Sequence, residues 1–194
     1  MSDMTDPTTT WQRLRAGISH PTDGPVAAVF RCADAGISSE TVFNQPSGAL
    51  LDVSTWGHAV DTSVLASIEY AVETLEIPLV VVLGHDDCPA MRAALRAWEQ
   101  AQLPDGAMRT AVEHALLSVV RRGAAGDSVE SVTSAHIVET GLGLMQRSPA
   151  LARRVDRREC AIVCATFSPA DREISVHATL GAVGETNGVL VECV

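Results

Sequence analysis

Runs of consecutive apolar, β-branched residues alternate along the chain with stretches whose apolar residues recur at helical spacing. Four runs are bounded by turn signals, which is typical of buried strands: 26–32, 49–54, 79–84 and 160–167. Residues 173–179 alternate apolar and polar positions and predict a final strand at a sheet edge. Because helices separate most of these strands, the pattern predicts an α/β fold. We expect a mostly parallel central sheet with an antiparallel edge strand, flanked by helices.

Helix signals fall between the predicted strands. Ser38 begins a capped helical turn, and Asp61 or Thr62 caps an amphipathic helix that ends before the third strand. Pro89 suits the first position of the next helix, with Cys88 just before it. Further helices are predicted over 108–122, 129–146 and 149–155.

The length of 194 residues favours one domain. Residues 1–10 are polar and predict a disordered N-terminus, with Thr10 as the cap of a short helix over 11–18. The remaining residues, 11–194, are expected to form a single α/β domain.

Composition narrows the class of protein. The 14 basic and 24 acidic residues give a formal net charge of −10, which argues against nucleic acid and anionic membrane surfaces as partners. No apolar run approaches the roughly 20 residues that span a bilayer, and the N-terminus has no apolar signal segment. The five cysteines therefore indicate reduced thiols or metal ligands, and the cytoplasm is the expected compartment.

Candidate metal ligands follow the first and third predicted strands. Cys32 and Asp34 stand at the end of one, and His85 and Cys88 follow the other. Neighbouring parallel strands end at the same edge of a sheet, where open α/β sheets bind ligands, so these four side chains should converge. Two sulfurs, one nitrogen and one carboxylate form a zinc ligand set.

The residue patterns leave two questions open. A His-x-x-Cys motif alone fits a hydrogen-bonded histidine and a buried thiol as well as a metal site. If Cys32, His85 and Cys88 hold zinc, water in the fourth position would have its pKa lowered to roughly 7 and supply hydroxide. If Asp34 takes that position instead, the site is closed and activates nothing.

The two stretches resemble motifs of the β-class carbonic anhydrases. That family has a Cys-x-Asp-Ser-Arg stretch and a Gly-His-x-x-Cys-Gly stretch, which here are 32–36 and 84–89. The resemblance is clear over about 26–97 and weaker beyond. It implies zinc at Cys32, His85 and Cys88, reversible hydration of CO2 to bicarbonate by zinc-bound hydroxide, and a homodimer or larger homo-oligomer. Asp34 is implied as the catalytic residue that accepts a hydrogen bond from that hydroxide.

Three departures from the family pattern bear on catalysis. The family's Arg that holds the Asp off the metal is Gly36 here, which leaves Asp34 freer to bind zinc. Pro89 replaces a Gly and removes a backbone N–H. Where the family has an Arg-x-x-Gly-Asn loop, this chain has Ser54 to His58, so Trp56 and His58 would reshape the mouth of the site.

The same residues also fit two other functions. A catalytically silent, zinc-closed homologue with a structural, sensing or partner-binding role is one alternative, and a hydrolase of a related small molecule such as carbonyl sulfide is another. Asp86 and Asp87 fit either hydrogen bonding to metal ligands or plain helix-capping acids. The remaining candidates are interpreted as structural: Cys160, Cys164, His114, His136 and His177.

Overall fold

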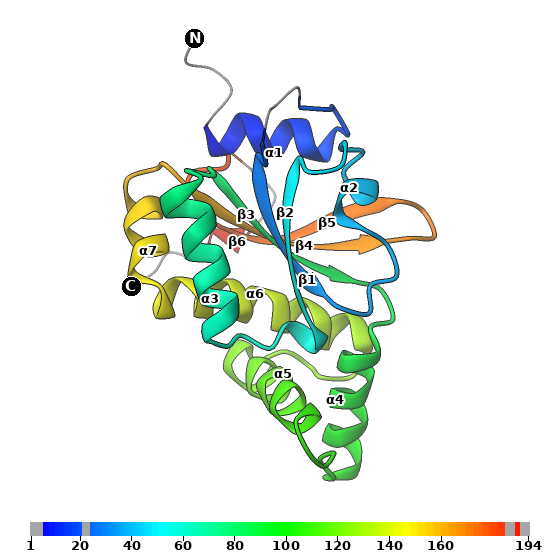
Figure 1. Ribbon diagram of the computed structural model, residues 1–194. Coiled ribbons are helices and arrows are strands. Elements are labelled where there is room, and N and C mark those ends of the chain that lie inside the picture. The colour runs from blue at the N-terminus through cyan, green and yellow to red at the C-terminus, as the bar shows by residue number, and fades with distance from the viewer. Residues whose placement is uncertain (1–5, 21–23, 185–188, 191–194) are drawn as a thin grey trace.

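The protein folds as a six-stranded sheet with helices on both faces (Figure 1). The computed structural model describes residues 6–20, 24–184 and 189–190. The strands are β1 (Ala27–Cys32), β2 (Leu50–Thr55), β3 (Leu79–His85), β4 (Ala161–Ser168), β5 (Glu173–Leu180) and β6 (Val189–Leu190). The α-helices are α1 (Pro7–Arg15), α2 (Ser39–Val42), α3 (Thr62–Glu69), α4 (Pro89–Gln100), α5 (Met108–Arg122), α6 (Val129–Arg147) and α7 (Pro149–Asp156). A 3-10 turn, η1 (Trp56–His58), and a π-helical turn, η2 (Tyr70–Thr74), complete the fold.

The strand order is β2-β1-β3-β4-β5-β6, so the sheet is mostly parallel. Strands β1 to β4 are parallel, β5 is antiparallel to β4, and β6 pairs in parallel with β5. The predicted fold class is confirmed. The antiparallel edge nevertheless has one strand more than expected, because the short β6 covers the far side of β5.

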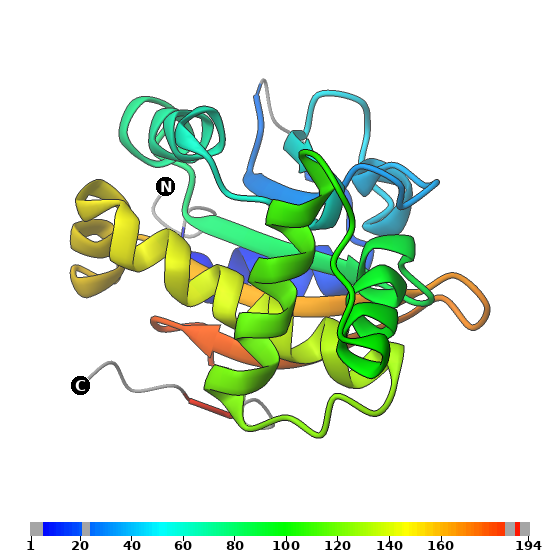
Figure 2. The ribbon, with the colours of Figure 1, turned by 90° about the horizontal axis from the view of Figure 1, so that it is seen from below.

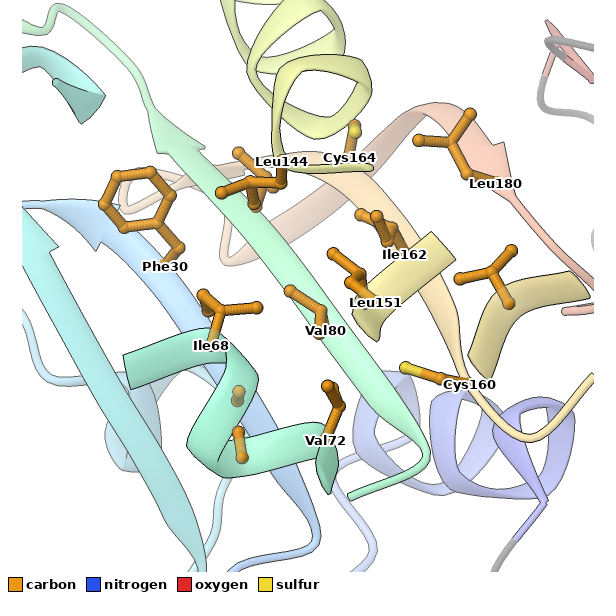
Figure 3. Close-up of a cluster of buried hydrophobic side chains, with 14 of the residues drawn as sticks. Phe30, Ile68, Val72, Val80, Leu144, Leu151, Cys160, Ile162, Cys164 and Leu180 are labelled. Carbon is orange, nitrogen blue, oxygen red and sulfur yellow. The ribbon is translucent and has the colours of Figure 1, made fainter. Parts of the chain in front are cut away.

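Alternate residues of the strands point to opposite faces and build two cores. On one face, α3, α6 and α7 cover a cluster that contains Phe30, Val80 and Ile162 (Figure 3). On the other face, Trp11 and Leu14 of α1 pack against the other strand residues. Both faces of the central strands are therefore buried, which explains their continuous apolar runs.

Helix α6 lies very close to the sheet. A Cβ atom on Gly141 would stand 2.6 Å from the Cys164 sulfur, so this position of the helix accommodates only hydrogen. The glycine inside the helical pattern of residues 129–146 is thus explained by packing rather than by a helix break. Cys164 shares this core with Cys160 (Figure 3).

The N-terminal prediction was partly wrong. Helix α1 begins at Pro7, because the Asp6 side chain accepts a hydrogen bond from the Thr9 N–H and proline suits the first helical turn. Residues 7–10 are therefore helical rather than disordered, and Thr10 is buried inside the helix rather than capping it. Residues 1–5 lie outside the described part of the chain.

Helices α4 and α5 extend beyond the sheet at the end where β3 stops (Figures 1 and 2). They pack on a third apolar cluster that includes Cys32, Cys88 and Met91. This cluster joins the helical extension to the ends of β1 and β3. Among the described helices, none has the length and apolar composition needed to cross a membrane.

Candidate metal centre

Four potential ligands meet at the ends of β1 and β3. Cys32 is the last residue of β1, and His85 is the last residue of β3. The two strands are neighbours, with Arg31 beside Leu83 in register. Asp34 follows two residues after β1, and Cys88 is the residue that precedes α4. One ligand atom from each of the four side chains lies within 4.8 Å of the others, so the predicted convergence is present in the structure.

His85 presents a nitrogen lone pair to the cluster. Its Nδ1 is 3.0 Å from the backbone oxygen of Asp86, which can only accept, so Nδ1 carries a proton. In the neutral ring Nε2 is then an acceptor, yet it faces Asp34 Oδ1 at 3.1 Å. Two acceptors at this distance require a proton or a cation between them. Burial lowers the pKa of His85, but hydrogen bonds to Cys32 and Asp34 outweigh it and raise the pKa overall.

The two sulfur atoms lie 3.8 Å apart. Their contact, together with burial, raises the pKa of Cys32, whereas the same contact lowers the pKa of Cys88. Backbone N–H groups of Ala90 and Met91, in the first turn of α4, also lower the pKa of Cys88. The contact therefore favours the thiolate form of Cys88 over that of Cys32, and the thiolate is the form that binds metals.

Asp34 completes the cluster with an incomplete set of partners. Its Oδ1 is also 4.0 Å from the Cys88 sulfur, while its Oδ2 is buried and has no hydrogen-bond partner among the described residues. A buried carboxylate oxygen without a partner is costly and calls for a cation or a donor. With two thiol groups, an unprotonated imidazole nitrogen and this carboxylate together, the donor set fits a zinc ion.

At Gly36, where the resemblance implies an arginine, the surrounding space is unfilled. Gly36 is exposed and has φ of +67°, and a Cβ there would meet only the backbone oxygen of Asp34, at 4.0 Å. Nearby Arg31 does not substitute for the family's arginine, because its side chain pairs with Asp52 at 2.9 Å. The described structure thus places no cationic side chain on Asp34 in that role.

The expected neighbours of the site divide into two groups. His58 is buried: its Nε2–H donates to Leu83 O, and its ring packs edge-on against Phe30. Trp56 packs against the third apolar cluster. Two roles were left open for Asp87, and its side chain is 74% exposed and pairs with Arg92. The contribution from this loop comes instead from the backbone carbonyl of Asp86.

Sequence reasoning missed a hydrogen bond to one of the sulfurs. The Gly57 N–H donates to Cys32 Sγ at 3.1 Å, and the Gly57 carbonyl accepts from His136 at 2.9 Å. His136 lies 79 residues from Gly57 along the chain, so no local pattern signals the contact. The histidine itself, within the predicted helix 129–146, was the one sequence signal near this contact.

The other titratable candidates lie away from the cluster. Cys160 and Cys164 are buried in the sheet core, where burial raises the pKa of each to about 12 and keeps both as inert thiols. His177 bonds to Thr166 on β4. His114 is exposed on α5.

Known proteins resemble this chain over most of its length. A family model described as carbonic anhydrase matches residues 27–174. A carbonic anhydrase of Mycolicibacterium smegmatis is 36% identical over 201 residues, covering 93% of this chain and 98% of the relative. Carbonic anhydrase 2 of Mycobacterium tuberculosis is also 36% identical, over 202 residues with the same shares.

Solved structures share the fold. A Coccomyxa β-carbonic anhydrase in complex with acetazolamide gives a TM-score of 0.69 at 18% identity, covering 83% of this chain and 76% of its own. A tetrameric β-carbonic anhydrase from Sordaria macrospora gives 0.66 at 19% identity, covering 80% and 81%. Given the family match over residues 27–174 and the 36% identity, this chain belongs to the β-carbonic anhydrase family.

Proposed function

We propose that the chain catalyses the reversible hydration of CO2 to bicarbonate with a zinc ion held by Cys32, His85 and Cys88. The observation that carries the proposal is the convergence of these three side chains with Asp34 at one edge of the sheet, in a chain of this family. Zinc in such a site supplies a Lewis acid that lowers the pKa of bound water to about 7.

The protein residues have separate tasks in this proposal. The Asp86 carbonyl fixes the ring of His85 so that Nε2 points to the metal position. Asp34, whose side chain is 25% exposed, offers the unpaired Oδ2 as a hydrogen-bond acceptor for the water that adds to CO2. The reaction releases one proton for each bicarbonate formed, and that proton passes to solvent.

Stopped-flow CO2 hydration at pH 7 and pH 9, together with zinc content, tests this function. We expect one zinc per chain and hydration above the buffer rate at one or both pH values. Zinc-loaded protein with no rate above buffer at either pH would exclude CO2 hydration while retaining the metal site.

A catalytically silent, zinc-closed protein is the second candidate. It is favoured by the place of Asp34 Oδ1 within the ligand cluster, 3.1 Å from His85 Nε2, and by the neutral Gly36. X-ray absorption spectroscopy of the zinc protein distinguishes the two, because carboxylate and water ligands can be compared at pH 7 and pH 9 in wild-type protein and in Asp34→Asn. A carboxylate ligand at both pH values would favour the closed form.

We further propose a homodimer or larger homo-oligomer in a reducing compartment, the cytoplasm. Within the described part of the chain, strand β2 has one unpaired edge, next to a surface cavity of about 580 Å³ bordered by β2 and α3. Such an edge is normally covered. The four described cysteines are free thiols, which supports a reducing environment. Sedimentation analysis would give the oligomeric state.

A further inference from the structure

A chain of buried hydrogen bonds runs from α5 to the candidate metal centre. The Ser118 hydroxyl lies 3.0 Å from His136 Nδ1, and His136 Nε2 lies 2.9 Å from Gly57 O. The N–H of the same glycine lies 3.1 Å from Cys32 Sγ. Both Ser118 and His136 are buried, with 2% and 3% of their surface exposed.

The direction of each hydrogen bond follows from the chemistry of the groups. A carbonyl oxygen can only accept, so His136 carries its proton on Nε2 and donates it to Gly57. Its Nδ1 is then an acceptor. The Ser118 hydroxyl lies 3.0 Å from this nitrogen and 2.8 Å from the His114 carbonyl, so its single proton is shared between two acceptors. The Gly57 carbonyl therefore fixes the tautomer of His136, and Ser118 is a polar neighbour of its other nitrogen.

Gly57 is held tightly between its partners. Its φ of +63° lies in the left-handed region, and a Cβ would stand 3.1 Å from the Cβ atoms of Ala90 and Ala111. The turn therefore packs directly against α4 and α5, and hydrogen bonds fix both the carbonyl and the N–H of this residue. Because only small shifts are possible here, the donor to Cys32 has a defined direction.

We propose that His136 is a positioning residue of the metal centre, which holds turn η1 so that the Gly57 N–H points at the sulfur of Cys32. A hydrogen bond of this kind orients a thiolate ligand and disperses its charge. The inference rests on the proposed zinc site and adds a residue from α6 that touches no ligand itself. Packing alone does not require an imidazole at this position, whereas the contact with Gly57 O requires a donor.

The test compares His136→Leu with His136→Gln. Leucine keeps much of the volume without a donor, whereas glutamine carries an N–H near the position of Nε2. Zinc affinity by chelator competition, and the thiolate-to-metal charge-transfer band of the cobalt-substituted protein, are the readouts. We expect His136→Leu to lose roughly 10- to 100-fold in zinc affinity and to shift the band, and His136→Gln to restore most of both.

Two further variants separate positioning from general stability. Leu144→Ala weakens the same helix from a core site, and should lower the melting temperature without altering the zinc affinity or the band. Ser118→Ala should change both metal readouts in the same direction as His136→Leu, by less, and serves if the leucine variant does not fold.

The experiment distinguishes failure of this inference from failure of the proposed function. Wild-type protein that binds no zinc overturns both the function and this inference. Zinc-binding wild-type protein overturns the inference alone if the His136 and Ser118 variants keep its affinity and band, if glutamine rescues nothing, or if Leu144→Ala produces the same changes.

Discussion

The two strand ends that form the candidate metal centre are held to different degrees. At the end of β3, the His85 ring is fixed by the Asp86 carbonyl, and Cys88 sits at the first turn of α4. At the end of β1, Cys32 has the Gly57 N–H, but Asp34 leaves one oxygen unpaired beside a glycine. The difference separates two proposed roles: the proposed metal ligands have several fixed contacts, whereas Asp34, the proposed catalytic residue, has fewer.

The largest expected effect is a loss of zinc binding, from a substitution at the end of β3. Cys88→Ser should lose zinc affinity by more than about 100-fold, since residues that merely orient a ligand are already worth about 10- to 100-fold. Metal analysis after dialysis measures this. Cys164→Ala, a buried cysteine in the sheet core, is the matched control and should keep one zinc per chain. Equal zinc content in Cys88→Ser and wild type would contradict a ligand role.

Asp34→Asn tests the loosely held end. The amide cannot accept a proton as a carboxylate does, so CO2 hydration should fall by about 10²- to 10⁴-fold while zinc stays at one per chain. Stopped-flow rates and metal content of one preparation provide the comparison. Parallel loss of zinc and activity would mean that both strand ends serve metal binding. The proposed difference between the roles of the β1 and β3 ends would then be wrong.

Gly36→Arg tests whether a cationic side chain can fix the position of Asp34. A guanidinium two residues after Asp34 could make a charge-assisted hydrogen bond, worth about 1.5–3 kcal/mol, and raise hydration at pH 7 by about tenfold. The positive φ costs about 1–2 kcal/mol for any side chain, so Gly36→Ala is the control with the same backbone penalty. Identical rates for the two variants would show that the arginine finds no partner here.

Acid should lower the stability of the fold through two buried histidines: His58, which bonds to Leu83 of β3, and His136, which bonds to turn η1. Burial lowers the pKa of His136 to about 4, and burial with the nearby His136 ring lowers the pKa of His58 to about 3. In the unfolded chain both titrate near about 6.5. Below that pH the unfolded chain binds protons that the folded chain does not. The free energy of unfolding should therefore fall by up to about 1.4 kcal/mol per pH unit for each histidine.

Urea unfolding of metal-free protein at pH 7, 6 and 5 measures this dependence. His136→Gln removes one of the two titrating groups and should make the pH dependence shallower than in wild type. A dependence that is equally steep in both proteins would exclude His136 as a source of the acid sensitivity.

Local signals predicted most of the fold. The apolar runs gave β1 to β4, and the capping side chains of Ser38 and Asp61 mark real helix starts. Helix α1 was placed too late, because the polar sequence of residues 7–10 hides a proline start capped by Asp6. The two residues of β6 give no periodic signal of their own.

Strand topology was enough to predict which residues meet at the candidate site, but not the contacts around them. Cys32 and His85 end neighbouring parallel strands, so their meeting follows from the order of elements. The Gly57 and His136 contacts depend on how deeply α6 sits on the sheet, which is a property of packing. The two roles left open for Asp87 could not be separated from the sequence, because its left-handed φ of 52° and its contact with Arg92 are properties of the folded loop.

The sulfurs of Cys32 and Cys88 belong to residues 56 positions apart, and they meet where β1 and β3 leave the sheet. An ion held there would act as a cross-link that closes a long loop, with no counterpart in the unfolded chain. Folding and metal loading would then be one linked equilibrium, and the lifetime of the native protein would follow the free zinc concentration around it.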